Sequence, residues 1–174
     1  MSEDIFEEEE QIAQEQASTE ARELRRTMRD LPALQPPITC ERSATIRQAI
    51  EVMQREQIDC VLVVDLGHLV GIFTAWDVLT KVAAREVDID RLRIETLMTP
   101  HPDCLHPDDE LAYALNHMGV WDSQYIPLVD DDERPTGVVS MRHIIDYLVG
   151  MFPQDVFNLP PSPRHGIAPQ PEGA

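Results

Sequence analysis

Lysine and arginine are scarce in this sequence: 14 basic residues stand against 32 acidic ones among 174, which gives a formal net charge of −18. Nucleic acids and anionic membrane surfaces attract clustered basic residues, so this imbalance argues against both as partners. Much of the negative charge is local, because residues 3–10 read EDIFEEEE. We interpret this run as a solvated face or arm, with a docking segment for a basic protein partner as the alternative.

The sequence also lacks a long apolar run, a signal peptide and a disulfide framework. No stretch reaches the roughly 20 apolar residues that cross a bilayer, since the most apolar segment contains Asp65, His68 and Asp77. The N-terminus is acidic where a signal peptide is basic and then apolar. The 3 cysteines form no disulfide pattern and fit a reducing compartment. We therefore expect a cytoplasmic protein without membrane insertion.

Fingerprints of catalysis are missing as well. There is no sequence pattern of a nucleophilic triad, a zinc protease, a P-loop or a dinucleotide-binding fold. His101, Cys104 and His106 lie close together, but alternate residues of an extended segment face opposite sides, and no second cluster completes a tetrahedral set. We therefore expect no metal site, no catalytic cofactor and no enzymatic activity.

An internal repeat fills the middle of the chain, from about residue 36 to 152. Laid 65 residues apart, Met53 aligns with Met118 and Asp65 with Asp130. One extra turn residue then moves the offset to 66, so that the segment GIFTAWD (71–77) aligns with GVVSMRH (137–143). Several matches in one register predict a duplicated structural unit.

Each copy predicts the element order β-α-β-β-α. We expect helices over 45–57, 75–87, 110–122 and 141–151, and strands over 37–40, 60–65, 69–74, 102–105, 125–130 and 136–140. Short turns make the last two strands of each copy antiparallel, and the helices cover the sheet. The predicted fold class is therefore α+β. Since a unit of about 50 residues buries too little surface alone, the two should pack together.

The two ends of the chain differ from the repeats. Residues 1–35 are charged and predict a helical arm, in which Leu24, Met28 and Leu31 have helical spacing. Residues 153–174 are rich in proline without periodicity, which predicts an extended or disordered tail. The expected division is an arm over 1–35, repeats over 36–92 and 93–152, and a tail over 153–174.

The repeated unit resembles a known domain. Its apolar strand ending in VVD or LVD and its closing motif, Gly-apolar-x-Thr/Ser-x-x-Asp, are similar to the cystathionine-β-synthase (CBS) domain, and two in tandem resemble a CBS-domain pair of the small stand-alone bacterial type. The junction IETLMTPHPDCLHPDDEL (94–111) is similar to the opening of a second CBS repeat. The resemblance implies repeats packed with pseudo-twofold symmetry through their sheets, two clefts between them and a homodimer. It also implies binding of AMP, ADP, ATP or S-adenosylmethionine as a regulatory ligand.

The closing motif of the first copy suits a ribose phosphate. An ionised Asp77 can accept hydrogen bonds from both ribose hydroxyls, while Thr74 lies at a helix start, where free N–H groups favour a phosphate. The alternative is that Thr74 and Asp77 only form a capping box. With the second wall placed by the resemblance, the predicted nucleotide site comprises Gly71, Ile72, Thr74, Trp76, Asp77, Pro102, Asp103, Ser123, Gln124 and Tyr125.

The second copy departs from the motif at His143. A neutral imidazole has one acceptor nitrogen and a charged one has none, so it cannot replace a carboxylate that accepts two hydrogen bonds. Ser140 can still cap the helix, and Arg142 suits phosphate oxygens. This cleft is therefore either an atypical anion site or empty. Its predicted residues are Ile38, Thr39, Ile58, Asp59, Cys60, Ser140, Arg142 and His143.

Together these features predict a regulatory module that binds an adenine nucleotide or another adenosyl ligand between its repeats. Binding would shift the relative arrangement of the repeats and so change a dimer or a contact with an unidentified protein partner. The alternative is an interaction scaffold that binds no nucleotide and acts through its acidic arm and its C-terminal region.

Overall fold

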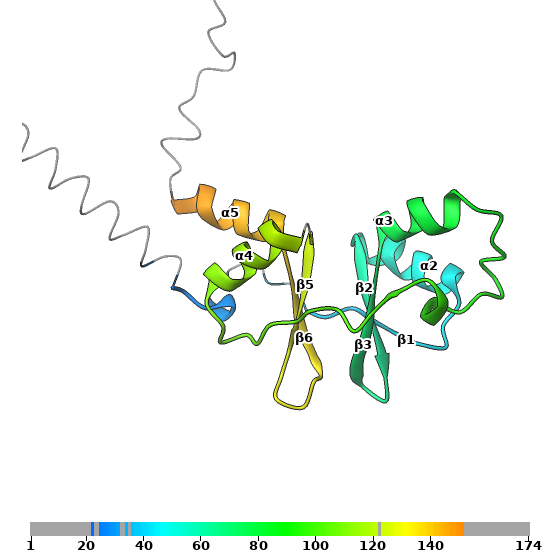
Figure 1. Ribbon diagram of the computed structural model, residues 1–174, viewed down its shortest axis with the longest axis horizontal. Coiled ribbons are helices and arrows are strands. Elements are labelled where there is room, and N and C mark those ends of the chain that lie inside the picture. Colours follow the sequence, from blue (N-terminus) through cyan, green and yellow to red (C-terminus); the bar gives the residue numbers. More distant parts are fainter. Residues whose placement is uncertain (1–21, 23–24, 32–33, 35, 122, 152–174) are drawn as a thin grey trace, which may run out of the picture.

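The computed structural model describes residues 22, 25–31, 34, 36–121 and 123–151, so the acidic run at 3–10 and the tail at 153–174 lie outside the described residues. Two β-α-β-β-α units lie next to each other, with the strands of each turned toward the other and the helices on the outer sides (Figure 1). This arrangement confirms the predicted α+β fold of two repeats packed through their sheets.

The first unit has a four-stranded sheet and two helical segments. Its strands are ordered β1 (Thr39–Glu41), β2 (Cys60–Asp65), β3 (His68–Thr74) and β4 (Thr99–Pro100). Strand β1 is parallel to β2, and the other pairs are antiparallel. Helix α2 (Ile46–Glu56) begins at the capping residue Thr45 and ends at Gln57, whose φ of 55° is left-handed. The second segment starts as α3 (Ala75–Asp77) and widens into π-helical turns over Val78–Ala83, so it ends four residues before the predicted position 87.

The second unit has a smaller sheet. It contains α4 (Leu111–Trp121), β5 (Tyr125–Val129), β6 (Pro135–Ser140) and α5 (Met141–Met151), with β5 and β6 antiparallel. The strand predicted over 102–105 is reduced to a single bridge, in which the N–H of Leu105 donates to the carbonyl of Pro127 at 3.1 Å. The next bond of a parallel ladder would need an N–H from Pro127, which proline lacks, so the predicted strand does not extend before Leu105.

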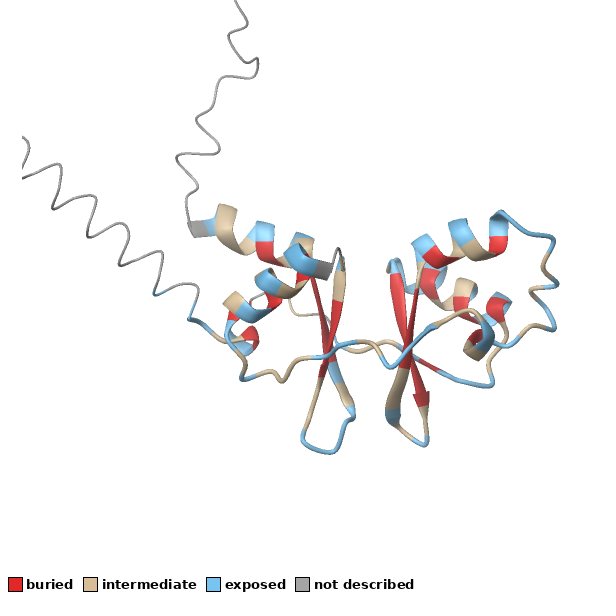
Figure 2. Cartoon of the chain, viewed as in Figure 1, coloured by how far each residue is buried: buried red, intermediate tan, exposed pale blue. Residues whose placement is uncertain are grey.

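Alternating residues of the strands divide the core into layers. Val61, Val63 and Phe73 pack against the helices of the first unit. The opposite faces of the sheets meet between the units, where Leu62 and Val138 belong to one buried cluster. Because β2 is covered on both sides, its sequence CVLVV is apolar throughout rather than alternating, and Figure 2 shows the strands as the most continuously buried elements.

The described end of the predicted helical arm is a 3₁₀ turn rather than an α-helix. Met28–Asp30 form a 3₁₀ turn, and Thr27 makes a β-bridge with Glu110. Met28 and Leu31 are buried in the core of the second unit, so this segment precedes the first repeat in sequence but packs on the second. The spacing of three residues from Met28 to Leu31 fits a 3₁₀ turn as well as an α-helix.

The turns of the two β-hairpins join the units at one end. The N–H of Leu69 donates to the carbonyl of Glu133 at 3.0 Å, and His68 Nδ1 donates to the carbonyl of Asp132 at 2.8 Å. Since both contacts pair the β2–β3 hairpin with the β5–β6 hairpin, they fix the register between the two sheets.

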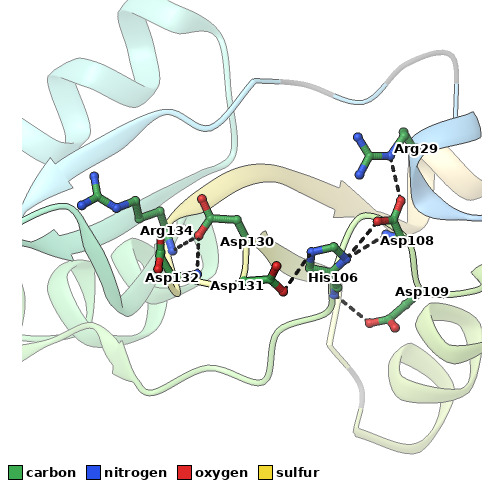
Figure 3. Close-up of polar contacts among 8 residues, drawn as sticks. All are labelled: Arg29, His106, Asp108, Asp109, Asp130, Asp131, Asp132 and Arg134. Atoms are coloured by element: carbon green, nitrogen blue, oxygen red, sulfur yellow. Dashed lines mark hydrogen bonds and ion pairs between the residues drawn. The ribbon is translucent and has the colours of Figure 1, made fainter.

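Acidic residues near this end serve local structure (Figure 3). Asp130 Oδ1 accepts from the N–H groups of Asp132 and Arg134, which closes the turn of the second hairpin. Asp108 pairs with Arg29 of the N-terminal segment at 2.8 Å, on the surface of the second unit. Asp109 Oδ2 likewise accepts from the N–H of His106, so Asp109 and Asp130 both close local turns.

Candidate functional site

Two clefts lie between the repeats. The first, which we call the Asp77 cleft, has a volume of about 570 Å³ and is lined by Ile72, Thr74, Trp76, Asp77, Thr99, His101, Pro102, Asp103, His117, Ser123, Gln124 and Tyr125. The second, the His143 cleft, has a volume of about 690 Å³ and is lined by Gln57, Ile58, Asp59, Cys60, Met118, Ser123, Gln124, Tyr125, Val138, Ser140, Met141, Arg142, His143 and Asp146. Both volumes lie within the range usual for small-molecule sites.

The structure brings the residues predicted for the nucleotide site together around the Asp77 cleft, with one exception. Gly71 does not line the cavity. It lies beside Met98, and a Cβ atom at this position would stand 2.3 Å from the Met98 sulfur. Gly71 is therefore needed for close packing between β3 and the segment that joins the repeats, and it lies outside the lining of the cavity.

The corner between β3 and α3 is a complete capping box. The N–H and the hydroxyl of Thr74 donate to Asp77 Oδ2 at 2.8 and 2.9 Å, and the N–H of Asp77 donates to Thr74 Oγ1 at 3.2 Å. The Thr74 hydroxyl oxygen thus caps the N–H of Asp77, and the buried Asp77 carboxylate accepts in return from Thr74. This is the capping box that the sequence offered as the alternative to a ligand site. It lies on the wall of the cavity.

Lys81 is a functional neighbour that the sequence analysis missed. Its Nζ lies 2.7 Å from Asp77 Oδ1 and also donates to the carbonyl of Leu97 at 2.9 Å. The spacing of four residues between Asp77 and Lys81 on a helix was the available signal. The ion pair compensates the charge of a carboxylate whose side chain is only 9% exposed.

The lining of the Asp77 cleft also contains residues that neither the motif nor the resemblance had indicated. Thr99 and His101 come from the segment joining the repeats, and His117 comes from α4. His117 Nε2 lies 3.2 Å from Asp103 Oδ2, so an imidazole and a carboxylate face the cavity together. Trp76 stands at the rim, with 69% of its surface exposed.

The corner between β6 and α5 has the same shape with a different acceptor. The N–H of Ser140 donates to His143 Nδ1, and the N–H of His143 donates to Ser140 Oγ, both at 3.2 Å. Since Nδ1 accepts, the proton of the neutral ring is on Nε2. Burial lowers the pKa of His143, the Asp146 carboxylate opposes this shift, and Arg142 adds to it. The imidazole is thereby kept neutral in a place where the first copy has an anion.

The residues predicted for the second cleft are brought together there except for two. Ile38 packs into the core of the first unit, and Thr39 lies on β1 at the edge of that sheet. Neither lines the cavity. The alignment of the two repeats placed them in the cleft by analogy with Asp103 of the second repeat. In the first repeat, however, the corresponding segment is strand β1 of the sheet, where Thr39 pairs with Leu62.

The segment from Ser123 to Tyr125 lines both clefts. Burial and the neighbouring Asp59 carboxylate, which also accepts a hydrogen bond from the hydroxyl, raise the pKa of Tyr125 to about 12. The ring packs beside the cluster between the sheets. Tyr125 is therefore both a cavity wall and part of the inter-repeat core, which are the two roles open to it from sequence.

Two searches of the described residues were negative. No group of three or more His, Cys, Asp or Glu side chains is placed to hold a metal ion there. In the same part of the chain, no helix has the length and apolarity that a membrane span requires.

Known proteins resemble this chain over its repeats. A protein of Schizosaccharomyces pombe named meiotically up-regulated gene 70 protein is 36% identical over 100 residues, which are 58% of this chain and 14% of that protein. The chain spans between 14 and 25% of the lengths of the curated relatives it matches.

Among solved structures, the CBS domain pair of protein MJ0100, in complex with 5′-methylthioadenosine and S-adenosyl-L-methionine, is 28% identical with a TM-score of 0.62. It covers 70% of this chain and 98% of its own. The CBS domain of a CBS domain containing membrane protein from Sphaerobacter thermophilus is 26% identical with a TM-score of 0.63, over 77% of this chain and 96% of its own.

The family model described as CBS domain matches this chain twice, at residues 19–84 and 94–150. These matches coincide with the two β-α-β-β-α units and with the two corners that line the clefts. The chain therefore belongs to the CBS-domain family, with two copies of the domain in tandem.

Proposed function

We propose that this chain is a regulatory module that binds an adenosyl ligand in the Asp77 cleft. The observation that carries the proposal is the position of a buried carboxylate and a hydroxyl residue, Asp77 and Thr74, on the wall of a cavity of about 570 Å³ between two repeats. A ribose offers two adjacent hydroxyl donors, and a carboxylate accepts such donors well.

The charge of the cleft favours a particular class of adenosyl ligand. Among the described residues that line it, none is Lys or Arg, while Asp77 and Asp103 are carboxylates. Lys81 is paired with Asp77 and does not line the cavity, so a ligand with a chain of phosphates would find no cation on the wall itself. A thioadenosyl or sulfonium ligand would find an uncharged or negative wall. The structure of a 28% identical CBS domain pair with 5′-methylthioadenosine and S-adenosyl-L-methionine supports this preference over AMP, ADP or ATP.

Ligand binding would change the conformation of the protein because the cleft lies between the two repeats. A ligand that contacts Asp77 in the first repeat and Tyr125 in the second favours one relative arrangement of the repeats. Exposed apolar side chains on the second helices, Trp76, Leu79 and Ile145, suit contact with a second copy of the chain. The module would then act through a homodimer or a protein partner, without catalysis of its own.

One observation favours a second candidate, an interaction scaffold without nucleotide. Asp77 already has protein partners on both carboxylate oxygens, so its presence is explained by capping and pairing alone. In that case the Asp77 cleft would be a by-product of the packing of two repeats.

Thermal unfolding with and without ligand separates the two candidates. Saturating S-adenosylmethionine or 5′-methylthioadenosine should raise the melting temperature of the wild type, because a ligand that binds only the folded state stabilises it. Asp77→Ala should show no such rise. A lack of response to these two compounds and to AMP, ADP and ATP, all at millimolar concentration, would favour the scaffold.

A further inference from the structure

Lys81 is paired with one oxygen of the carboxylate to which the proposed function assigns the ribose. Its Nζ is 2.7 Å from Asp77 Oδ1, and its side chain is 33% exposed against 9% for Asp77. It is also the only lysine in the sequence. The aligned position of the second repeat, 66 residues later, is Tyr147, so this contact belongs to one corner only.

The acceptor capacity of Asp77 is nearly used up inside the protein. Oδ2 accepts from both the N–H and the hydroxyl of Thr74, and Oδ1 accepts from Lys81. A carboxylate offers about four acceptor positions, so one position on Oδ1 is left for two ribose hydroxyls. A ribose that donates both hydroxyls to Asp77 must therefore displace Lys81.

The second contact of Lys81 points to what its displacement would do. The ammonium also donates to the carbonyl of Leu97 at 2.9 Å. Leu97 precedes Met98, which packs against Gly71, and the segment continues through Thr99 to the wall of the cleft. One side chain thus joins the acceptor of the ligand site to the segment between the repeats.

We infer that Lys81 competes with the ribose for Asp77 and couples ligand binding to the segment that joins the two repeats. This inference rests on the proposed function, since it concerns the same cleft. Lys81 is a positioning residue: in the empty protein it holds Asp77 and Leu97 together, and in the bound protein it leaves Asp77 to the ribose. Its removal should tighten ligand binding while loosening the joining segment.

Because the chain has a single lysine, amine reactivity reports on this contact directly. We would treat the full chain with an acetylating reagent and follow modification of Lys81 by mass spectrometry, separately from the N-terminal amine. Without ligand, modification should be slow, and Asp77→Asn should accelerate it several-fold. Saturating 5′-methylthioadenosine should accelerate it in the wild type. Modification that is unchanged or slower with bound ligand would overturn the inference.

Binding by calorimetry gives a second, independent readout. Lys81→Met should bind 5′-methylthioadenosine about fivefold more tightly than the wild type, which corresponds to the loss of a competing ion pair of modest strength. Lys81→Arg retains a cation and should bind like the wild type. The 2′-deoxy analogue, with one hydroxyl, fits the remaining acceptor position and should gain nothing from Lys81→Met. Equal or weaker binding of the full ribose by Lys81→Met would contradict the competition.

The failure of the proposed function would look different. If the wild type binds no adenosyl ligand, the proposed function fails, but the Asp77→Asn acceleration still tests whether Asp77 restrains Lys81. If the wild type binds and Lys81 stays protected, only the competition is wrong.

Discussion

The two strand-to-helix corners of this protein share one shape and differ in one acceptor. At the first, Asp77 accepts from the N–H and hydroxyl of Thr74 and from Lys81. At the second, His143 accepts a single hydrogen bond from the N–H of Ser140, at 3.2 Å. Capping the turn between strand and helix requires only one side-chain hydrogen-bond acceptor, at the third residue of the helix. Binding a ribose requires acceptors beyond that, and only the carboxylate can supply them.

The largest expected effect comes from removing the first acceptor. Asp77→Ala should lower the free energy of unfolding by about 3 kcal/mol, because it leaves the partly buried polar groups of Thr74 and Lys81 without their charged partner. His143→Ala should cost about 1 kcal/mol, as the loss of a capping contact does. Urea unfolding of the three proteins measures both values. Equal costs would show that the two corners are energetically alike.

A second difference lies between a glycine of the first repeat and a glycine of the second. Gly71→Ala should destabilise the protein by about 1–3 kcal/mol, since the new Cβ overlaps the sulfur of Met98 and forces it to move. Gly119→Ala is the matched control: it lies in helix α4 with open space around it and should stabilise by about 0.5–1 kcal/mol. If Gly71→Ala changed the free energy of unfolding as little as the control does, Met98 would have room to move. That result would contradict the proposed packing role of Gly71.

The second corner should make stability depend on pH in a way that the first does not. Burial lowers the pKa of His143 in the folded protein below its ordinary value of about 6.5, despite the Asp146 carboxylate nearby. The unfolded chain then binds more protons at mildly acidic pH, so His143 contributes stability that is present above pH 6.5 and is lost as pH falls below it.

His143→Asn keeps an acceptor at this position and cannot take up a proton. Chemical unfolding between pH 7.5 and 5 should therefore show a smaller loss of stability for this variant than for the wild type. Parallel curves for the two proteins would mean that protonation of His143 is not unfavourable to the fold.

The smallest effects should come from exposed ion pairs, in either repeat. Arg47 pairs with Asp90 in the first unit and Arg29 with Asp108 in the second, and all four side chains are largely exposed. Such pairs contribute little because water and salt screen them. Arg47→Ala and Arg29→Ala should leave the urea midpoint unchanged within error. A clear loss for Arg29→Ala alone would show that the N-terminal segment depends on its ion pair as well as on Met28.

Much of this architecture could be predicted from the repeat. A register shared by two segments located both corners, and the apolar runs CVLVVD (60–65) and YIPLVD (125–130) predicted β2 and β5. Because the clefts follow from packing two such units, most residues predicted for each cavity came together. The alignment of the two repeats predicts where each residue lies along the backbone. This position largely determines which side chains line a cleft.

Features that depend on one particular side-chain contact could not be predicted from the sequence. The role of Gly71 depends on where Met98 packs, and that of Lys81 on the rotamer that reaches Asp77 and Leu97. The burial of Met28 in the second unit depends on a contact between segments about 80 residues apart, for which local periodicity gives no signal. Ile38 and Thr39 were misplaced because the pseudo-twofold analogy breaks where β1 forms a strand and its counterpart forms one bridge.

The central claim is that one corner binds a ligand and its duplicate does not. Isothermal titration of S-adenosylmethionine and 5′-methylthioadenosine into the wild type, Asp77→Ala and His143→Ala tests it directly, with folding checked in the same samples. The account predicts one ligand per chain, lost in Asp77→Ala and retained in His143→Ala. Two ligands per chain, or binding that survives Asp77→Ala and disappears in His143→Ala, would contradict it.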